Sequence, residues 1–478
     1  MTETTEPSEK IDWRALWAAG DLSRFCFVAL GILLHATNET MVATILPRMV
    51  SDLSGVEWAG WAFALYELGA IVAGASAGRL VSYMPLRLNM MLAAVIFAIG
   101  AAICATAPVM PVFLTGRLVQ GIGGGALVSL AFVSVERLFP PRIWPQLFGI
   151  MSAIWGVAAF TGPLLGAVVA EMFNWRWAFA IFTLAGLSMA TLAYRVLATP
   201  KAASQTSERT PPFPYAALLV LTASVVMIAS AGVNIQPLRS GLLLTAGLFG
   251  LILFFRLDAA RPASRLFPSR PFNLKTRLGS GMVMIAALSV STCSLVVYGP
   301  LLLTTLHGMS LIATGYLIAA ESISWSILSI IVANAQPRHE RAIILLGVSM
   351  IAAGVAGFAY AVPDGSVPLL LGCAILQGGG FGIAWPFVTR MIVAAAPPGE
   401  STIASSGVPA MQRIGYSVGA ASCGLVANAA GFSEGLTRDA AANVAVWVFL
   451  AFLPLALVGV LAAARLVLAG RRPPHNGA

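Results

Sequence analysis

Three acidic side chains lie deep inside apolar runs of this sequence, where an ionisable group is costly. They are Glu39, Glu67 and Glu321, and two arginines, Arg117 and Arg413, lie at similar positions within other apolar runs. A charge near the middle of a membrane-spanning helix costs roughly 2.5–3.5 kcal/mol, so such groups usually face a protein interior or a watery cavity and have a partner. A carboxyl that is both buried and close to a guanidinium is pulled toward both of its protonation states. We therefore expect these residues to move protons or to hold a charged ligand.

Glu39, Glu67 and Arg117 form the predicted proton-coupling group. Counted at 1.5 Å per residue, Glu39 lies about 6 Å and the other two about 4 Å outward of their helix centres, so all three could meet at one depth. His35, Asn38 and Glu39 share one helix face, because they stand at positions i, i+3 and i+4. We expect Glu39 or Glu67 to carry the proton. The alternative is a static ion pair with Arg117 that only locks helices together.

A second group of residues predicts a pocket for a small molecule. Glu321 and Arg413 fall near their helix centres, which favours either an ion pair between them or a contact with a charged substrate. Trp325 stands one turn beyond Glu321, and aromatic surfaces with a few polar groups are typical of small-molecule pockets. The predicted substrate-binding residues are His35, Asn38, Gln120, Trp155, Tyr298, Glu321, Trp325, Gln377, Phe381, Trp385 and Arg413.

Arg117 also heads a ladder of glycines, in the order Arg-Leu-Val-Gln-Gly-Ile-Gly-Gly-Gly-Ala. Glycines let a neighbouring helix backbone approach closely, which is how spanning helices pack in lipid. The predicted helix-packing residues are Gly121, Gly125, Gly162, Pro163 and Gly166. The same spacing fits a loose dinucleotide-binding fingerprint, but that motif needs a preceding strand and turn, which a continuous apolar run does not provide.

Composition places these residues in an all-α polytopic membrane protein. Hydrophobic residues make up 58% of the 478-residue chain and charged residues only 10%, which excludes a soluble domain. The five cysteines fall in apolar runs without ligand spacing, so we expect no metal site. The net charge of +9 is scattered between apolar runs, which argues against nucleic acid as a partner. No phosphate-binding loop is present, so we expect no cofactor and no enzyme.

The chain divides into two halves around a short insertion. We expect a cytoplasmic tail over 1–23, a six-helix bundle over 24–197, linkers with an inserted helix pair over 198–277, a second six-helix bundle over 278–468 and a tail over 469–478. At about 20 apolar residues per crossing, the sequence predicts fourteen spans. They lie near 24–46, 59–80, 88–107, 109–131, 144–170, 177–197, 214–232, 239–257, 278–303, 311–335, 341–362, 367–392, 402–430 and 442–468.

Two patterns set the expected topology and mechanism. With fourteen spans and the N-terminus inside, 22 Lys and Arg residues fall on the inner side and four on the outer side, which predicts cytoplasmic termini. The pair Gln120-Gly121 recurs as Gln377-Gly378 at an offset of 257 residues. Repeated halves with a substrate site between them are typical of alternating-access transporters.

Several local matches carry a resemblance to a known family. The run from Arg117 to Ala126 resembles the fourth-helix motif of the major facilitator superfamily, whose arginine is associated with proton coupling. The run from Gly149 to Gly166 is similar to the fifth-helix motif of its antiporters, and residues 175–179 and 261–272 also match. The chain therefore resembles the superfamily's fourteen-helix drug:proton antiporter branch. That resemblance implies two six-helix bundles, an inserted pair and proton-driven transport.

The sequence departs from the family pattern at two places. The first-helix motif usually carries an aspartate where this chain has Asn38, and its acid, Glu39, comes one residue later. The loop between the second and third helices keeps Gly78 and Arg87 but has Ser82 in place of its acid. The gating latch formed by that loop is therefore in question.

These observations favour a proton-coupled exporter of small amphipathic or aromatic molecules that works by alternating access. One alternative is uptake of a flat heteroaromatic nutrient such as riboflavin or another vitamin, and a second is a lipid-handling translocase. We expect the partners to be the small-molecule substrate, protons and membrane lipids. We expect a monomer in the inner (cell) membrane of a bacterial-type cell.

Overall fold

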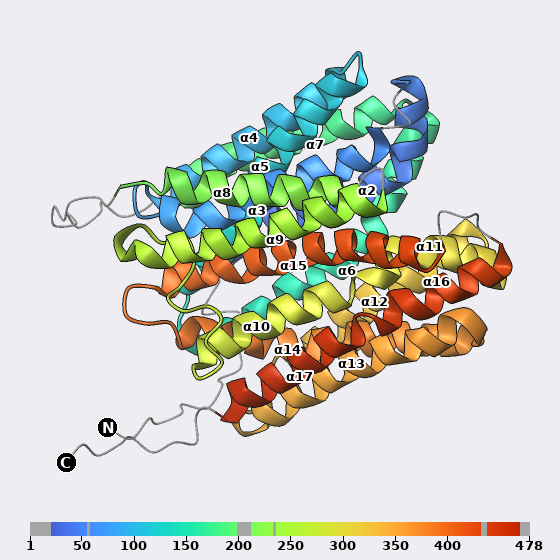
Figure 1. Ribbon diagram of the computed structural model, residues 1–478. Helices are drawn as coiled ribbons and strands as arrows, with labels where there is room; N and C mark the ends of the chain where they lie inside the picture. The colour runs from blue at the N-terminus through green and yellow to red at the C-terminus, as the bar shows by residue number, and fades with distance from the viewer. Residues whose placement is uncertain (1–20, 55–57, 198–211, 233–235, 432–436, 469–478) are drawn as a thin grey trace.

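The computed structural model describes residues 21–54, 58–197, 212–232, 236–431 and 437–468, and every regular element in these ranges is a helix. A helix satisfies its backbone N–H and C=O groups internally, as a lipid environment demands. The first six long helices form the N-terminal bundle (Figure 1). They are α2 (Asp21–Asp52), α3 (Ala59–Leu80), α4 (Leu86–Thr106), α5 (Met110–Leu138), α6 (Trp144–Met172) and α7 (Trp175–Val196).

The remaining helices are an inserted pair and the C-terminal bundle. The inserted pair is α8 (Tyr215–Ala231) and α9 (Pro237–Ala260). The C-terminal bundle comprises α10 (Arg277–Ser291), α11 (Cys293–His307), α12 (Leu311–Val332), α13 (Glu340–Asp364), α14 (Val367–Ala394), α15 (Ser401–Ala429), α16 (Arg438–Leu450) and α17 (Leu453–Leu468). The pairs α10–α11 and α16–α17 each form one continuous apolar stretch with a break near its middle. The prediction of an all-helical protein is thus confirmed for the described residues.

Twelve helical stretches among the described residues are long and apolar enough to cross a membrane. Two further helices differ from them in opposite ways. Helix α8 is apolar but has only 17 residues, and α15 has 29 residues but carries Gln412, Arg413 and several serines. A crossing needs about 20 residues. Twelve spans therefore follow from length and composition, and the count of fourteen stays a prediction.

The two bundles meet along two seams. Helix α6 packs against α12 on one side, and α3 and α5 pack against α15 on the other. The inserted pair lies across the second seam, because α8 contacts both α3 and α15 while α9 contacts α15 (Figure 1). The insertion is therefore placed to touch both bundles at once.

Close packing inside the N-terminal bundle depends on small residues. A Cβ at Gly121 would collide with the backbone of Tyr66, and one at Gly125 with Ala70, so α5 and α3 touch backbone to backbone. Gly162 and Gly166 of α6 lie against Thr40 and Met41 of α2, and Pro163 stands between them inside α6. These contacts fix how α2 and α3 present their polar side chains.

Candidate functional site

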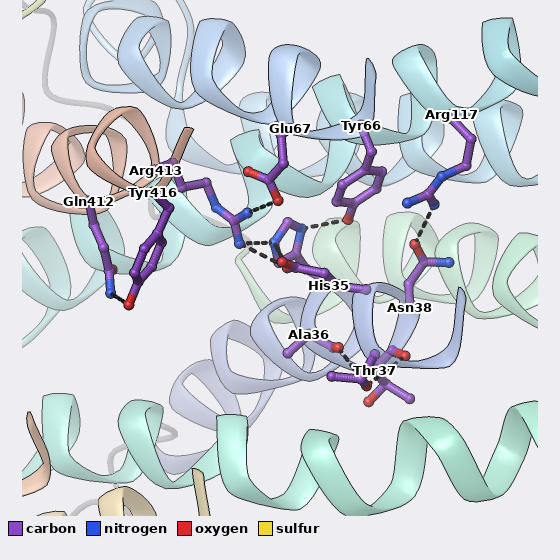
Figure 2. A network of polar contacts seen from close by, with 12 residues as sticks. His35, Ala36, Thr37, Asn38, Tyr66, Glu67, Arg117, Gln412, Arg413 and Tyr416 are labelled. Carbon is purple, nitrogen blue, oxygen red and sulfur yellow. Dashed lines mark hydrogen bonds and ion pairs between the residues drawn. The ribbon is translucent and has the colours of Figure 1, made fainter. Parts of the chain in front are cut away.

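Arg413 of α15 holds two carboxylates of the N-terminal bundle (Figure 2). Its Nη1 donates to Glu67 Oε1 at 2.5 Å, and its Nη2 donates to Glu39 Oε2 at 3.1 Å. Glu39 comes from α2 and Glu67 from α3, so this cluster joins both bundles. The Glu39 and Glu67 side chains remain 31% and 28% exposed, against 11% for Arg413. Both carboxylates therefore keep part of their surface uncovered by the protein while they hold the guanidinium.

His35 extends the Arg413 cluster into the N-terminal bundle. Its Nε2 lies 2.5 Å from Arg413 Nη2, and its Nδ1 lies 2.7 Å from the hydroxyl of Tyr66. A guanidinium only donates, so Nε2 accepts and the ring hydrogen resides on Nδ1, which donates to Tyr66. The ring of Trp155 lies edge-on to His35 and 5.8 Å from the Arg413 guanidinium carbon. His35 and Trp155 thus both fall at this predicted site.

Arg117 is fully buried and stands in a separate polar group. Its Nη1 donates to Asn38 Oδ1 at 2.9 Å and to Gln120 Oε1 at 2.6 Å, and its Nε donates to the carbonyl of Ala62 at 3.0 Å. The guanidinium carbon also lies 4.1 Å from the ring centroid of Tyr66. All of these partners are neutral, so the charge of Arg117 is stabilised by dipoles and an aromatic ring rather than by a carboxylate.

The predicted pairing of Arg117 with Glu39 or Glu67 is therefore wrong. Neighbouring residues on a helix point about 100° apart, since 3.6 residues make one turn. Asn38 faces α5 and meets Arg117, whereas Glu39 faces α15 and meets Arg413. The two acids do lie at one level, as their positions along the helices predict, but the arginine they share comes from the other bundle.

Glu321 forms a second polar contact, inside the C-terminal bundle. Its Oε1 accepts from Gln377 Nε2 at 2.9 Å, which links α12 to α14. One turn farther along each helix, the rings of Trp325 and Phe381 stack in parallel with centroids 4.6 Å apart. Trp385 lies edge-on to both of these rings. These four predicted substrate residues and Glu321 thus come together along one helix contact.

An ion pair between Glu321 and Arg413 was one of the two interactions predicted for these residues, and the structure does not form it. Arg413 is taken by Glu39, Glu67 and His35, and the hydrogen bond to Glu321 comes from Gln377. Depth along the helix placed both residues correctly near mid-span. It could not show that α15 turns Arg413 toward the N-terminal bundle.

The remaining predicted residues lie away from the Arg413 cluster. Gln120 is buried beside Arg117, and Tyr298 of α11 is buried in a core shared with α13, α14 and α16. Sequence reasoning missed Tyr66, which contacts both His35 and Arg117, and Tyr416, whose hydroxyl accepts from Gln412 Nε2 at 3.3 Å. Their positions in the sequence could have indicated both residues, because Tyr66 adjoins Glu67 and Tyr416 lies one turn from Arg413.

One end of the molecule, where α3 ends near Arg79 and α15 begins, is closed by contacts between the bundles. We call it the Arg79 end. Ser401 Oγ and Thr402 Oγ1 of α15 donate to the two carboxylate oxygens of Glu136, at 2.7 and 3.1 Å. Gly78 of α3 lies so close to Ser406 that a side chain there would collide with it. These contacts join α3 and α5 of the N-terminal bundle to α15 at the Arg79 end.

The linker after α9 adds a second set of contacts at the Arg79 end. Asp258 accepts from the backbone N–H groups of Leu266 and Phe267, at 2.7 and 3.1 Å, which fixes the turn of the linker. Arg79 of the N-terminal bundle donates to the carbonyl of Ala263 in the linker. Glu400, just before α15, accepts from Arg265 Nη1 at 3.2 Å and, with its other oxygen, from the backbone N–H of Ser269 at 2.7 Å. The linker thus ties the two bundles together.

Ligands for a metal ion do not come together in the part of the chain that the structure describes. No three His, Cys, Asp or Glu side chains there are grouped so that they could hold an ion. The site consists instead of carboxylates, guanidiniums and aromatic rings.

Comparisons with known proteins identify the family and the fold of this chain. The sequence profile described as Major Facilitator Superfamily matches residues 28–364. A protein of Mycobacterium tuberculosis named "Probable multidrug-efflux transporter" is 31% identical over 495 aligned positions, which cover 99% of this chain and 100% of that protein. The fold also matches that of the human organic anion transporter MFSD10, with a TM-score of 0.66 and 16% identity over 92% of this chain and 98% of that one. A proton:xylose symporter matches with a TM-score of 0.64 and 15% identity over 94% and 95% of the two chains.

Proposed function

This chain belongs to the major facilitator superfamily, and we propose that it exports small amphipathic or aromatic molecules in exchange for protons. It is a multi-pass membrane transporter rather than an enzyme. The name of the mycobacterial relative, which aligns with almost the whole chain, supports multidrug efflux as the activity. The two solved structures support the fold alone, because their sequences are too distant to indicate a substrate.

A single observation carries the proton-coupling part of the proposal. Two carboxylates of the N-terminal bundle, Glu39 and Glu67, share one guanidinium of the C-terminal bundle, Arg413. Protonating either acid removes one negative charge from this link and weakens the attraction between the bundles. A change in protonation is thereby converted into a change in how firmly the bundles hold each other, which is what proton-driven alternating access requires.

The closed Arg79 end supports a direction for the proton. The contacts of Glu136 with Ser401 and Thr402 join the bundles at that end, yet Glu39 and Glu67 remain partly exposed. We infer that solvent reaches these acids from the opposite end. If the Arg79 end is cytoplasmic, protons enter the cluster from outside, the link to Arg413 loosens, and the bundles reorient to take up substrate from the cytoplasm.

The topology that goes with this mechanism has fourteen spans and cytoplasmic termini. Helices α8 and α15 supply the two crossings beyond the twelve that length and hydropathy support. The excess of Lys and Arg in the segments at the Arg79 end favours the cytoplasm for that end. We propose that the protein acts as a monomer in the inner (cell) membrane of a bacterial-type cell.

Flux into proteoliposomes under an imposed pH gradient tests the proposed function. The compounds are a cationic aromatic dye, an uncharged aromatic dye and riboflavin, and the variants are Glu39→Gln, Glu67→Gln and Glu171→Gln. Glu171 is an exposed acid at the far end of α6 and controls for the loss of one charge. We expect the wild type and Glu171→Gln to drive dye against its gradient at the expense of the proton gradient. At least one of the other variants should lose this driven transport but keep dye exchange at equal pH.

Two outcomes contradict the proposal. Uphill dye transport that survives in both Glu39→Gln and Glu67→Gln would remove these acids from proton coupling. Accumulation of riboflavin in the same direction as the protons, with no dye movement, would make the protein an importer.

A further inference from the structure

His35 is fully buried and has a partner at each of its two ring nitrogens (Figure 2). Nε2 lies 2.5 Å from Arg413 Nη2, and Nδ1 lies 2.7 Å from the hydroxyl of Tyr66. A guanidinium only donates, so Nε2 carries no hydrogen and the neutral ring keeps its hydrogen on Nδ1. A protonated ring has a donor at both nitrogens. His35 therefore holds Arg413 only in its neutral form, which sets it apart from Glu39 and Glu67.

The guanidinium of Arg413 divides its hydrogens among three acceptors. Nη1 donates to Glu67, and Nη2 has two acceptors, Glu39 Oε2 at 3.1 Å and His35 Nε2. Glu39 and His35 stand one turn apart on α2, with Oε2 and Nε2 3.3 Å apart, so both face the same nitrogen. A planar guanidinium held at both terminal nitrogens is fixed in one orientation. The acceptor on His35 remains in place when either acid is protonated.

A glycine of α5 makes room for the contact between His35 and Tyr66. A Cβ at Gly124 would lie 2.6 Å from both His35 Nδ1 and the hydroxyl oxygen of Tyr66. No side chain fits there unless these two polar atoms move. Trp155 of α6, which does not titrate, lies edge-on to the imidazole. Helices α3, α5 and α6 thus all help to fix the ring that α2 presents to Arg413.

The charged and titratable groups around His35 come from four helices. They are Glu39 from α2, Tyr66 and Glu67 from α3, Arg117 from α5 and Arg413 from α15. A proton on His35 would add a positive charge directly against Arg413 and remove the acceptor that the guanidinium uses. The histidine is therefore suited to hold the arginine, while the acids carry the proton.

We propose that His35 is a positioning residue of the proton-coupling cluster, which orients Arg413 toward both acids. This inference rests on the proposed function and adds to it the residue that sets the strength of the link between the bundles. Tyr66 and Gly124 act through His35, because one accepts the ring hydrogen and the other leaves space for that bond. Without the acceptor on His35, Arg413 attracts the acids less firmly, and proton-driven transport should reach its half-maximum at a higher pH.

Nitrogen-15 spectra of histidine-labelled, full-length protein in detergent at pH 7 test the contact itself. The chain has four histidines, and the signals of His35 are those missing in His35→Gln. In the wild type we expect a hydrogen on Nδ1 and none on Nε2. Nε2 should gain a hydrogen in Arg413→Met, because Glu39 Oε2, 3.3 Å away, then becomes its acceptor. The control Tyr416→Phe, which loses a hydroxyl one turn from Arg413, should change neither nitrogen.

The pH profile of proton-driven dye transport tests the positioning role. Glutamine can place its amide oxygen near the position of Nε2, whereas the shorter asparagine reaches only the position of Nδ1. We therefore expect His35→Gln to keep the wild-type profile. His35→Asn keeps a partner for Tyr66 but loses the one for Arg413. Its half-maximal pH should rise by about one unit, because hydrogen bonds to charged groups are among the stronger ones.

Two results would overturn the inference. One is a hydrogen on Nε2 of His35, or on both nitrogens, in the wild type. The other is a wild-type pH profile in His35→Asn while Glu39→Gln and Glu67→Gln abolish driven transport, since the acids would then couple without the histidine. Driven transport that survives in both acid variants would refute the proposed function alone, because the spectra need no proton gradient and still report whether His35 holds Arg413.

Discussion

Replacing Gly121 with alanine tests the packing role of the glycine ladder and leaves the neighbouring polar side chains unchanged. A Cβ at this position would lie 2.8 Å from both the Cα and the carbonyl carbon of Tyr66, and closer still to the Tyr66 oxygen. Carbon atoms pack best at about 3.5–4.0 Å, so the α3 and α5 backbones must move apart. The matched control is Gly372→Ala in α14, an exposed position with no other atom within 4 Å of the new Cβ.

The two substitutions are expected to change the free energy of unfolding in opposite directions. Alanine is about 1 kcal/mol more favourable than glycine in a helix interior, and both variants gain this term. Overpacking a tight contact costs typically about 1–3 kcal/mol, and more when backbone rather than a flexible side chain must yield. With the helix term subtracted, we therefore expect Gly121→Ala to be destabilised by up to roughly 2 kcal/mol and Gly372→Ala to be neutral or stabilised by up to about 1 kcal/mol.

Thermal unfolding in one detergent, at one scan rate, measures the difference between these variants. Gly121→Ala should also move Tyr66 relative to His35, whose Nδ1 lies 2.7 Å from the tyrosine hydroxyl, so proton-driven transport should fall together with the melting temperature. Equal melting temperatures for the two variants would refute the reasoning. Normal stability and normal transport in Gly121→Ala would also refute it, since backbone contact would then not position the cluster.

Two further predictions concern the ends of the molecule. Combining Arg79→Ala with Glu400→Ala removes the side-chain contacts of the linker with both bundles. Spin labels at the Arg79 end of α3 and α15 should then report a longer or broader distance distribution, and unchanged distances would contradict the role of the linker. At the opposite end, hydrogen bonds from Arg176 and Trp175 hold the pKa of Asp52 below its usual 3.8, so its stabilisation is present above that pH and is lost as the pH falls below it. The melting temperature of Asp52→Asn should therefore be lower than that of the wild type at pH 7, and the difference should shrink below pH 3.8.

Much of the architecture could be predicted because membrane helices obey one-dimensional rules. Length and hydropathy give the positions of the spans, and a rise of 1.5 Å per residue gives the depth of each polar side chain. Those rules brought Glu39 and Glu67 to one level, where the structure joins them through a single arginine. The same rules also placed Glu321 and Gln377 in one pocket region, which the structure links by a hydrogen bond.

The partners of the charged residues could not be predicted because they depend on rotation about each helix and on which helices are neighbours. Arg413 lies 346 residues from Glu67 along the chain, and no local pattern indicates that α3 meets α15. Arg117 was the nearer candidate partner for the acids by sequence. In the structure it pairs with Asn38 instead, because Asn38 rather than Glu39 faces α5. The contacts of the linker with Arg79 and Glu400 also could not be predicted, since the acceptor of Arg79 is the backbone carbonyl of Ala263.

The position of the first-helix acid at residue 39 rather than 38 changes which contact a proton would alter in the proposed mechanism. At position 38 a carboxylate would face Arg117, inside the N-terminal bundle, where the asparagine now supplies a neutral oxygen. The other side-chain partners of Arg117, Gln120 and the ring of Tyr66, do not titrate near neutral pH, so the charge of this group is constant. One residue later, Glu39 faces Arg413 across the seam between the bundles. In the proposed mechanism, a proton taken up there alters the attraction between the bundles rather than the internal packing of one of them, and alternating access would use that step.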